Sequence, residues 1–179
     1  TTHGPLAGVL SWLLDVCCRQ QLSGPGRIGL FVNPFYFARR GLLQAVRDLS
    51  HAGRGRVLDV GCGSRPYESL FEVSKYVGLE LDIPENRAAS NADVYYDGLT
   101  FPFESNYFDA VVCNQVLEHV FKPDTFILEI ARVLTPDGKL LLTVHFVWDE
   151  HEQPRYVCRY SSFGLTARLE RNGVAVSAV

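Results

Sequence analysis

Short apolar runs alternate with longer stretches of helical periodicity from about residue 56 to the end of the chain. Runs of this length, bounded by glycine, proline or polar turn residues, are typical of buried strands. The predicted strands are residues 56–60, 76–80, 94–96, 108–113, 139–145 and 174–179. The helical patterns predict helices over residues 5–22, 35–50, 66–72, 123–134 and 161–171.

This alternation, with its short links, predicts an α/β fold. Strands that are joined through helices form a doubly wound, mostly parallel sheet with right-handed crossovers. The helix over residues 5–22 stands apart, because a Ser-Gly-Pro-Gly stop follows it at residues 23–26. We therefore expect a helical extension over residues 1–34 and an α/β domain over residues 35–179. The extension is expected to dock on the sheet domain or on a second subunit, which would make a homodimer.

The composition is that of a globular chain, since 47% of its 179 residues are hydrophobic and 21% are charged. The net charge of −3 gives no electrostatic reason to expect nucleic acid or an anionic membrane as a partner. The apolar stretch at residues 6–16 is too short for a membrane span and lacks the features of a signal peptide. We therefore expect a cytoplasmic protein with no membrane span and no nucleic-acid partner.

The five cysteines are odd in number and form no C-x-x-C pair, so neither a disulfide framework nor a zinc site is predicted. Reduced thiols in a cytosol are the simplest interpretation. The acidic and histidine residues at 149–152 are consecutive, so most of them cannot converge on one ion. No metal site is therefore predicted.

The first predicted strand leads directly into the turn Gly61-Cys62-Gly63. Glycine suits a sharp turn or a close approach of the backbone to a ligand. A strand, a glycine turn and a helix form the place where open α/β sheets bind nucleotides. A dinucleotide site would need a third glycine where this chain has Pro66, and the Gly-Lys-Ser/Thr of a P-loop is absent. A purely structural turn is the alternative to a ligand site.

Polar residues end the next three predicted strands, at the edge where such sheets bind ligands. Glu80 ends the second strand, about twenty positions after the turn, where an acidic side chain can accept both hydroxyls of a ribose. Asp97 follows the third strand and is placed to accept from an adenine amino group, with Leu99 packing on the ring, unless it is only a turn residue. Asn114 and Gln115 follow the fourth strand and are placed to reach an amino-acid end of the ligand.

Over residues 35–179 the chain resembles the class I S-adenosylmethionine-dependent methyltransferases of the "type 11" group. The resemblance rests on VLDVGCGSRPYESLF at 57–71, YVGLELD at 76–82, ADVYYDGLTFPFESNYFDAVVCNQVLEHV at 92–120 and RVLTPDGKLLLTVHF at 132–146. It continues through HEQPRYVCRYSSFGLTARLERNGV at 151–174, which is similar to a bacterial subgroup associated with polysaccharide or glycolipid biosynthesis.

The resemblance implies a Rossmann-like domain over residues 35–179 that binds S-adenosylmethionine and releases S-adenosylhomocysteine. It implies that the glycine turn contacts the methionine part, Glu80 the ribose and Asp97 the adenine. The residues expected to bind the cofactor are Asp59, Gly61, Cys62, Gly63, Glu80, Leu81, Asp97, Gly98, Leu99, Asn114 and Gln115.

The activity that the resemblance implies is O-methylation of a small-molecule or glycan-type acceptor. A hydroxyl acceptor usually needs a base near neutral pH, and histidine titrates in that range. His145, at the end of the fifth predicted strand, and His151, in the loop beyond, are the expected catalytic residues. A non-catalytic cofactor-binding or interaction module that retains the fold is the alternative, and Pro66 disfavours a nicotinamide-dependent oxidoreductase.

Two departures from the family pattern leave the acceptor open. His145 stands where the subgroup usually has proline, and Arg155 stands where an acidic residue is usual. The family's seventh strand is expected to be absent, because the pattern ends with the predicted sixth strand. A truncated chain and a sheet edge covered by a partner both agree with that expectation.

Overall fold

The computed structural model describes residues 36–51, 55–145 and 155–178. The chain divides into two compact units, Thr1–Ser50 and His51–Val179. The first unit contains the helix α3 (Tyr36–Ser50), which confirms the helix predicted over residues 35–50. The predicted helix over residues 5–22 and the candidate base His151 lie outside the described residues.

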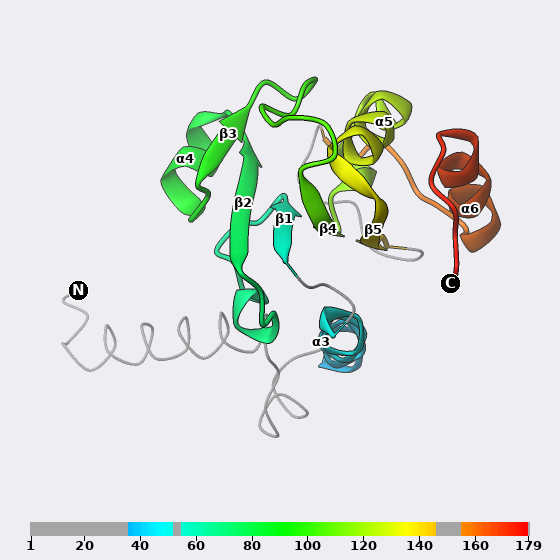
Figure 1. The fold of residues 1–179 in the computed structure, drawn as a ribbon, viewed down its shortest axis with the longest axis horizontal. Helices are drawn as coiled ribbons and strands as arrows, with labels where there is room; N and C mark the ends of the chain where they lie inside the picture. Colours follow the sequence, from blue (N-terminus) through cyan, green and yellow to red (C-terminus); the bar gives the residue numbers. More distant parts are fainter. Residues whose placement is uncertain (1–35, 52–54, 146–154, 179) are drawn as a thin grey trace, which may run out of the picture. The chain divides into compact units, whose positions relative to one another are not determined.

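The second unit is built on a five-stranded parallel sheet with the order β3-β2-β1-β4-β5 (Figure 1). Its strands are β1 (Arg56–Val60), β2 (Lys75–Leu81), β3 (Val94–Tyr96), β4 (Phe108–Asn114) and β5 (Leu134–Thr143). The chain winds outward from β1 to β3 and then crosses back to β4 on the other side of β1. This reversal beside the central strand makes the fold Rossmann-like, as predicted. Open α/β sheets usually bind their ligands at such a reversal, which here lies at the carboxyl ends of β1 and β4.

Three helices of the second unit are α4 (Pro84–Ala89), α5 (Pro123–Val133) and α6 (Ser162–Arg171). The structure confirms α5 and α6 to within a residue of their predicted bounds. Helix α5 buries an apolar stripe at helical spacing, made by Phe126, Ile127, Ile130 and Val133. Helix α4 was not predicted, although Pro84 at its first position followed by Glu85 is a typical helix start.

The helix predicted over residues 66–72 is wrong. Only a single 3-10 turn, η1 (Glu68–Leu70), forms there. The connection between Gly63 and Lys75 is at the lower limit of about 10–12 residues for a crossover that contains a helix. Arg65, with its φ of 57°, also turns the backbone away from a helical path before Pro66.

The strand predicted over residues 174–179 is also wrong, because the described residues 174–178 pair with no strand. The amide of Val174 instead donates to the carbonyl of Leu169 at 3.0 Å, which completes the end of α6. Segment 173–178 and β5 line the same groove of about 1080 Å³, so the groove separates the two segments where strand pairing was predicted. Among the described strands, β5 is therefore an edge strand.

Strand β5 is irregular where it leaves α5. Its register jumps from Phe108 opposite Leu134 to Ala110 opposite Lys139, so residues 135–138 loop out of the ladder. Regular pairing then continues to Thr143, and His145 follows two residues beyond the strand. The predicted strand over 139–145 thus matches the regular part of the ladder but overruns its end.

Candidate functional site

The glycine turn lies at the carboxyl end of the central strand β1. Gly61 has a φ of 71° and Gly63 a φ of 49°, both in the left-handed region that favours glycine. The amide of Gly61 donates to the carbonyl of Leu79 at 2.9 Å, which ties the turn to β2. A Cβ at position 61 would lie 2.3 Å from Cγ2 of Val116, whereas one at position 63 would meet nothing within 4 Å. Position 61 therefore requires glycine both for its backbone conformation and for lack of space, and position 63 for its backbone conformation alone.

The carboxylate of Glu80 is held against this turn. Its Oε2 accepts from the amide of Gly63 at 3.1 Å, and its Oε1 accepts from the amide of Leu81 at 3.1 Å and from Nδ2 of Asn86 at 3.0 Å. A carboxylate offers about four lone-pair positions, so Glu80 keeps acceptor capacity for a ligand. Asn86 lies on α4 and was missed because that helix was missed.

Asp97 forms the turn that follows β3. Its Oδ1 accepts from the amides of Leu99 at 2.8 Å and Thr100 at 3.0 Å. These backbone hydrogen bonds, that of Thr100 first, hold the pKa of Asp97 below its ordinary value. The side chain of Leu99 is 47% exposed, so an apolar surface is available beside this carboxylate.

Two charged residues of α5 fix the loop that carries Asp97 and Leu99. Arg132 donates to the carbonyls of Phe101 at 3.0 Å and Phe103 at 2.8 Å. Glu129 accepts from the amide of Phe101 at 2.7 Å and pairs with Arg132 at 2.7 Å, which lowers the pKa of Glu129. The sequence gives no local signal for this clamp, because its partners are 28–31 residues apart.

Asp59 is a buried acid on β1, two residues before the turn. Its side chain accepts from the hydroxyl of Tyr76 at 2.7 Å, and the residue is only 3% exposed. Burial raises the pKa of Asp59 to about 7, although the hydrogen bond from Tyr76 acts in the opposite direction. The nearby Glu80 adds to the rise. Asp59 thus changes its charge near neutral pH.

Cys62 is 3% exposed, and burial raises the pKa of its thiol to about 12. The side chain is therefore an unreactive filler, and only the backbone of Cys62 is available to a ligand at the sheet edge. Cys62, Cys113 and Cys158 are free thiols in the described part of the chain.

The ends of β4 and β5 are joined beside the glycine turn. Oδ1 of Asn114 accepts from the hydroxyl of Thr143 at 3.1 Å, and the amide of Gln115 donates to the carbonyl of Thr143 at 2.9 Å. Gln115 has a φ of 56°, which directs the chain so that Val116 packs against Gly61. The predicted residues at the ends of β1, β4 and β5 therefore come together at one edge of the sheet.

His145 is paired with a buried acid that sequence reasoning missed. Its Nδ1 lies 2.9 Å from Oε1 of Glu118, and the two side chains are 9% and 0% exposed. The carbonyl of Glu118 also accepts from the amides of Val157 at 2.9 Å and Cys158 at 3.1 Å. Glu118 thus connects the end of β5 with the segment that leads to α6.

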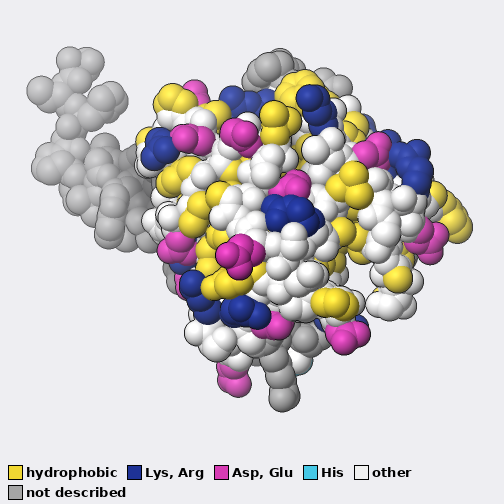
Figure 2. All heavy atoms as spheres, turned by 45° about the horizontal axis from the view of Figure 1, so that its top comes forward, with side chains coloured by type: hydrophobic (Ala, Val, Ile, Leu, Met, Phe, Trp, Pro, Cys, Tyr) yellow, Lys and Arg dark blue, Asp and Glu magenta, His cyan; other side chains and the backbone are white. Residues whose placement is uncertain are grey.

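Within the described ranges, no three His, Cys, Asp or Glu side chains are grouped so that they could hold a metal ion. None of the helices described is both long and apolar enough to cross a membrane. On the face shown in Figure 2, acidic and basic side chains are interspersed rather than gathered by sign.

Residues 58–142 match the methyltransferase domain family. The chain is 32% identical over 139 residues to a ubiquinone biosynthesis O-methyltransferase of Xanthomonas oryzae pv. oryzae, with 68% of this chain and 53% of the relative covered. It is 36% identical over 101 residues to a demethylmenaquinone methyltransferase of Corynebacterium urealyticum, with 54% of this chain and 44% of the relative covered. The chain thus spans about half the length of the curated relatives it matches.

Solved structures share the fold. A SAM-dependent methyltransferase from Aquifex aeolicus superposes with a TM-score of 0.58 at 22% identity, covering 82% of this chain and 86% of that one. A putative methyltransferase from Bacillus halodurans gives a TM-score of 0.59 at 21% identity, covering 73% and 68%. At these identities the likeness concerns the architecture.

Proposed function

We propose that this chain is a methyltransferase that uses S-adenosylmethionine to methylate an oxygen of a small-molecule acceptor. The observation that carries the proposal is the 3.1 Å hydrogen bond from the amide of Gly63 to Oε2 of Glu80. It joins a glycine turn to an acidic side chain at the position where doubly wound sheets bind nucleotide-type ligands. Both residues lie within the matched range 58–142, which supports the proposal.

The residues at this edge fit the proposed cofactor. Glu80 keeps acceptor capacity for the ribose hydroxyls, and the exposed Leu99 offers an apolar surface to the adenine ring. Asp97 has a second carboxylate oxygen for the adenine amino group, and we propose that Asp59 meets the ammonium group of the methionine part. When bound, the cofactor supplies a methyl group on a positively charged sulfur. The protein then contributes mainly alignment, which is worth about 7–11 kcal/mol in well-oriented reactions.

The identity of the methyl acceptor is proposed from the names of two relatives. One relative is named for O-methylation in ubiquinone biosynthesis and another for demethylmenaquinone, and both names point to quinone-type compounds. We propose a hydroxyl group on a compound of that kind as the first acceptor to test. A glycan hydroxyl is the second, in keeping with the subgroup that the sequence resembles.

The first test is calorimetric titration of the chain with S-adenosylmethionine, S-adenosylhomocysteine and NAD in parallel. We expect binding of both adenosyl compounds at micromolar concentration and none of NAD. Binding of NAD alone would favour an oxidoreductase. Binding of the adenosyl compounds without turnover on any hydroxylated acceptor would favour the non-catalytic module.

Replacing Glu80 by alanine is expected to weaken the binding of S-adenosylhomocysteine by about 1–3 kcal/mol, since it removes a charged acceptor from two hydroxyls. Calorimetry measures the change. The matched control is Asp82→Ala, which removes a neighbouring acid whose Oδ2 is paired with Arg87 at 2.8 Å on the surface. Equal affinities for the Glu80 variant and the unaltered chain would remove Glu80 from the site.

Replacing His145 by alanine is expected to lower kcat by about 10²–10⁴ while the cofactor affinity stays unchanged. We propose that Glu118, whose Oε1 lies 2.9 Å from Nδ1 of His145, orients the imidazole and that His145 accepts the proton of the acceptor hydroxyl. The check is the pH profile of kcat, which should lose its acidic limb in this variant. Turnover at the level of the unaltered chain over the whole pH range would rule out His145 as the base.

A further inference from the structure

The chain leaves the glycine turn through a residue in an unfavourable conformation. Arg65 has a φ of 57°, which side-chain-bearing residues rarely adopt. Its amide donates to the carbonyl of Cys62 at 2.8 Å, so the strained residue closes the turn itself. Only the short turn η1 follows, so no long helix is available to hold this part of the chain. Such a strained backbone conformation persists only where contacts with the surrounding structure hold it in place.

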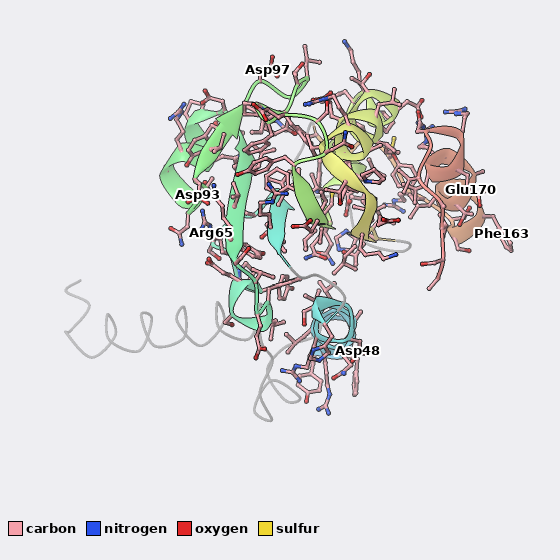
Figure 3. The ribbon with its side chains drawn as sticks, viewed as in Figure 1. Asp48, Arg65, Asp93, Asp97, Phe163 and Glu170 are labelled. Atoms are coloured by element: carbon pink, nitrogen blue, oxygen red, sulfur yellow. The ribbon has the colours of Figure 1, made fainter. Side chains whose placement is uncertain are left out.

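The side chain of Arg65 lies against β2 and makes the contacts that hold its backbone in this conformation. Its guanidinium forms an ion pair with Asp93, and the two residues lie beside each other next to β2 in Figure 3. A Cβ at Gly78 would come 2.8 Å from Nε of Arg65, so the glycine makes room for the guanidinium. Oδ2 of Asp93 also accepts from the amide of Gly78 at 2.9 Å. The side chain of Arg65 is 13% exposed and that of Asp93 is 47% exposed, so the pair is shielded from solvent mainly on the arginine side.

The same segment that provides Asp93 also holds the turn directly. The amide of Asn91 donates to the carbonyl of Gly63 at 2.8 Å, and Nδ2 of Asn91 lies 3.4 Å from the carbonyl of Ser64. On its other side, the amide of Gly63 donates to Oε2 of Glu80. Gly63 is thus held between Asn91 and Glu80, and any shift of the turn moves the donor that orients the Glu80 carboxylate.

We propose that Arg65, through its pair with Asp93, is a positioning residue for the ribose-binding carboxylate of Glu80. The inference rests on the proposed function. Arg65 acts through the turn and needs no contact with the cofactor. Its loss should therefore change the affinity for the cofactor and the KM for it, and leave kcat at saturating cofactor unchanged.

The experiment is a set of calorimetric titrations of the full chain with S-adenosylhomocysteine. Arg65→Met and Asp93→Asn are each expected to weaken binding about tenfold, and the double variant no more than either single one, because residues in one network couple. In a Glu80→Gln background, Arg65→Met should weaken binding less than about twofold. Arg65→Lys, which keeps the charge, should recover part of the loss. The matched control is Arg87→Met, which removes the exposed pair between Arg87 on α4 and Asp82 before that helix, and it should leave the affinity unchanged.

The outcomes separate the inference from the proposed function. No binding by the unaltered chain would overturn both. Normal binding by the unaltered chain and by Arg65→Met would overturn the inference alone. An equal loss in the Glu80→Gln background would also overturn it, since Arg65 would then act independently of Glu80. If Arg65→Met does not fold in a thermal melt, Asp93→Asn in the two backgrounds carries the same test, because it preserves the shape of the side chain.

Discussion

Alanine at position 61 is expected to destabilise the domain by about 2–5 kcal/mol. The φ of 71° is in the left-handed region, where a Cβ costs about 1–2 kcal/mol. The new methyl group would also lie 2.3 Å from Cγ2 of Val116, an overpacking that costs about 1–3 kcal/mol. The hydrogen bond from the amide of Gly61 to Leu79 prevents the backbone from moving away. Urea denaturation measures the loss as a fall in the midpoint.

The chain contains its own control for this prediction. Gly63→Ala introduces the same methyl group two residues later, at a φ of 49° and with nothing within 4 Å. It should therefore show only the backbone cost of about 1–2 kcal/mol. Adding Val116→Ala to Gly61→Ala should bring that variant close to the level of Gly63→Ala. Equal destabilisation by the two single alanine variants would mean that the contact with Val116 relaxes without cost.

The parts of the fold that depend on local pattern could be predicted from the sequence. The strands at residues 56–60 and 94–96 have the predicted bounds, and the carboxyl ends of the other described strands lie within two residues of theirs. Glu80, Asp97 and Asn114 therefore fall at strand ends, as predicted. An apolar run between turn residues is a strong signal because a central strand of a parallel sheet is buried on both faces.

The two wrong elements depend on contacts that no local pattern encodes. Tyr67, Leu70 and Phe71 give residues 66–72 a helical spacing. The left-handed backbone and the ion pair of Arg65 nevertheless set the path of the chain there. The β-branched residues after Gly173 look like a strand, yet a strand also needs a neighbour to pair with. The sequence did not reveal the role of Glu118 for the same reason. Its partner His145 is distant along the chain, and only the folded structure brings the two side chains together.

The stability that neutral Asp59 contributes is expected to fall as the pH rises toward and through 7. The pKa of this carboxyl is raised from 3.8 to about 7 in the folded chain, so the folded state keeps a proton that the unfolded state releases. The contribution is complete below about pH 4 and is lost as the pH passes 7. A shift of about three pKa units corresponds to about 4 kcal/mol. Denaturation midpoints of the unaltered chain and of Asp59→Asn, measured between pH 4 and pH 8, give the difference.

The Asp59→Asn variant separates stability from function. An uncharged side chain of the same shape has no cost of burying a charge, so the variant should be more stable than the unaltered chain at pH 8, by up to about 4 kcal/mol. If the ionised carboxylate meets the ammonium group at the amino-acid end of the cofactor, as proposed, the same variant should bind S-adenosylhomocysteine more weakly, because that product keeps the ammonium group. The affinity of the unaltered chain should then rise with pH through 7, whereas that of the variant should not. A variant that is more stable and binds equally well would show that Asp59 serves only the fold, since a carboxylate that binds a cation must be charged when it does so.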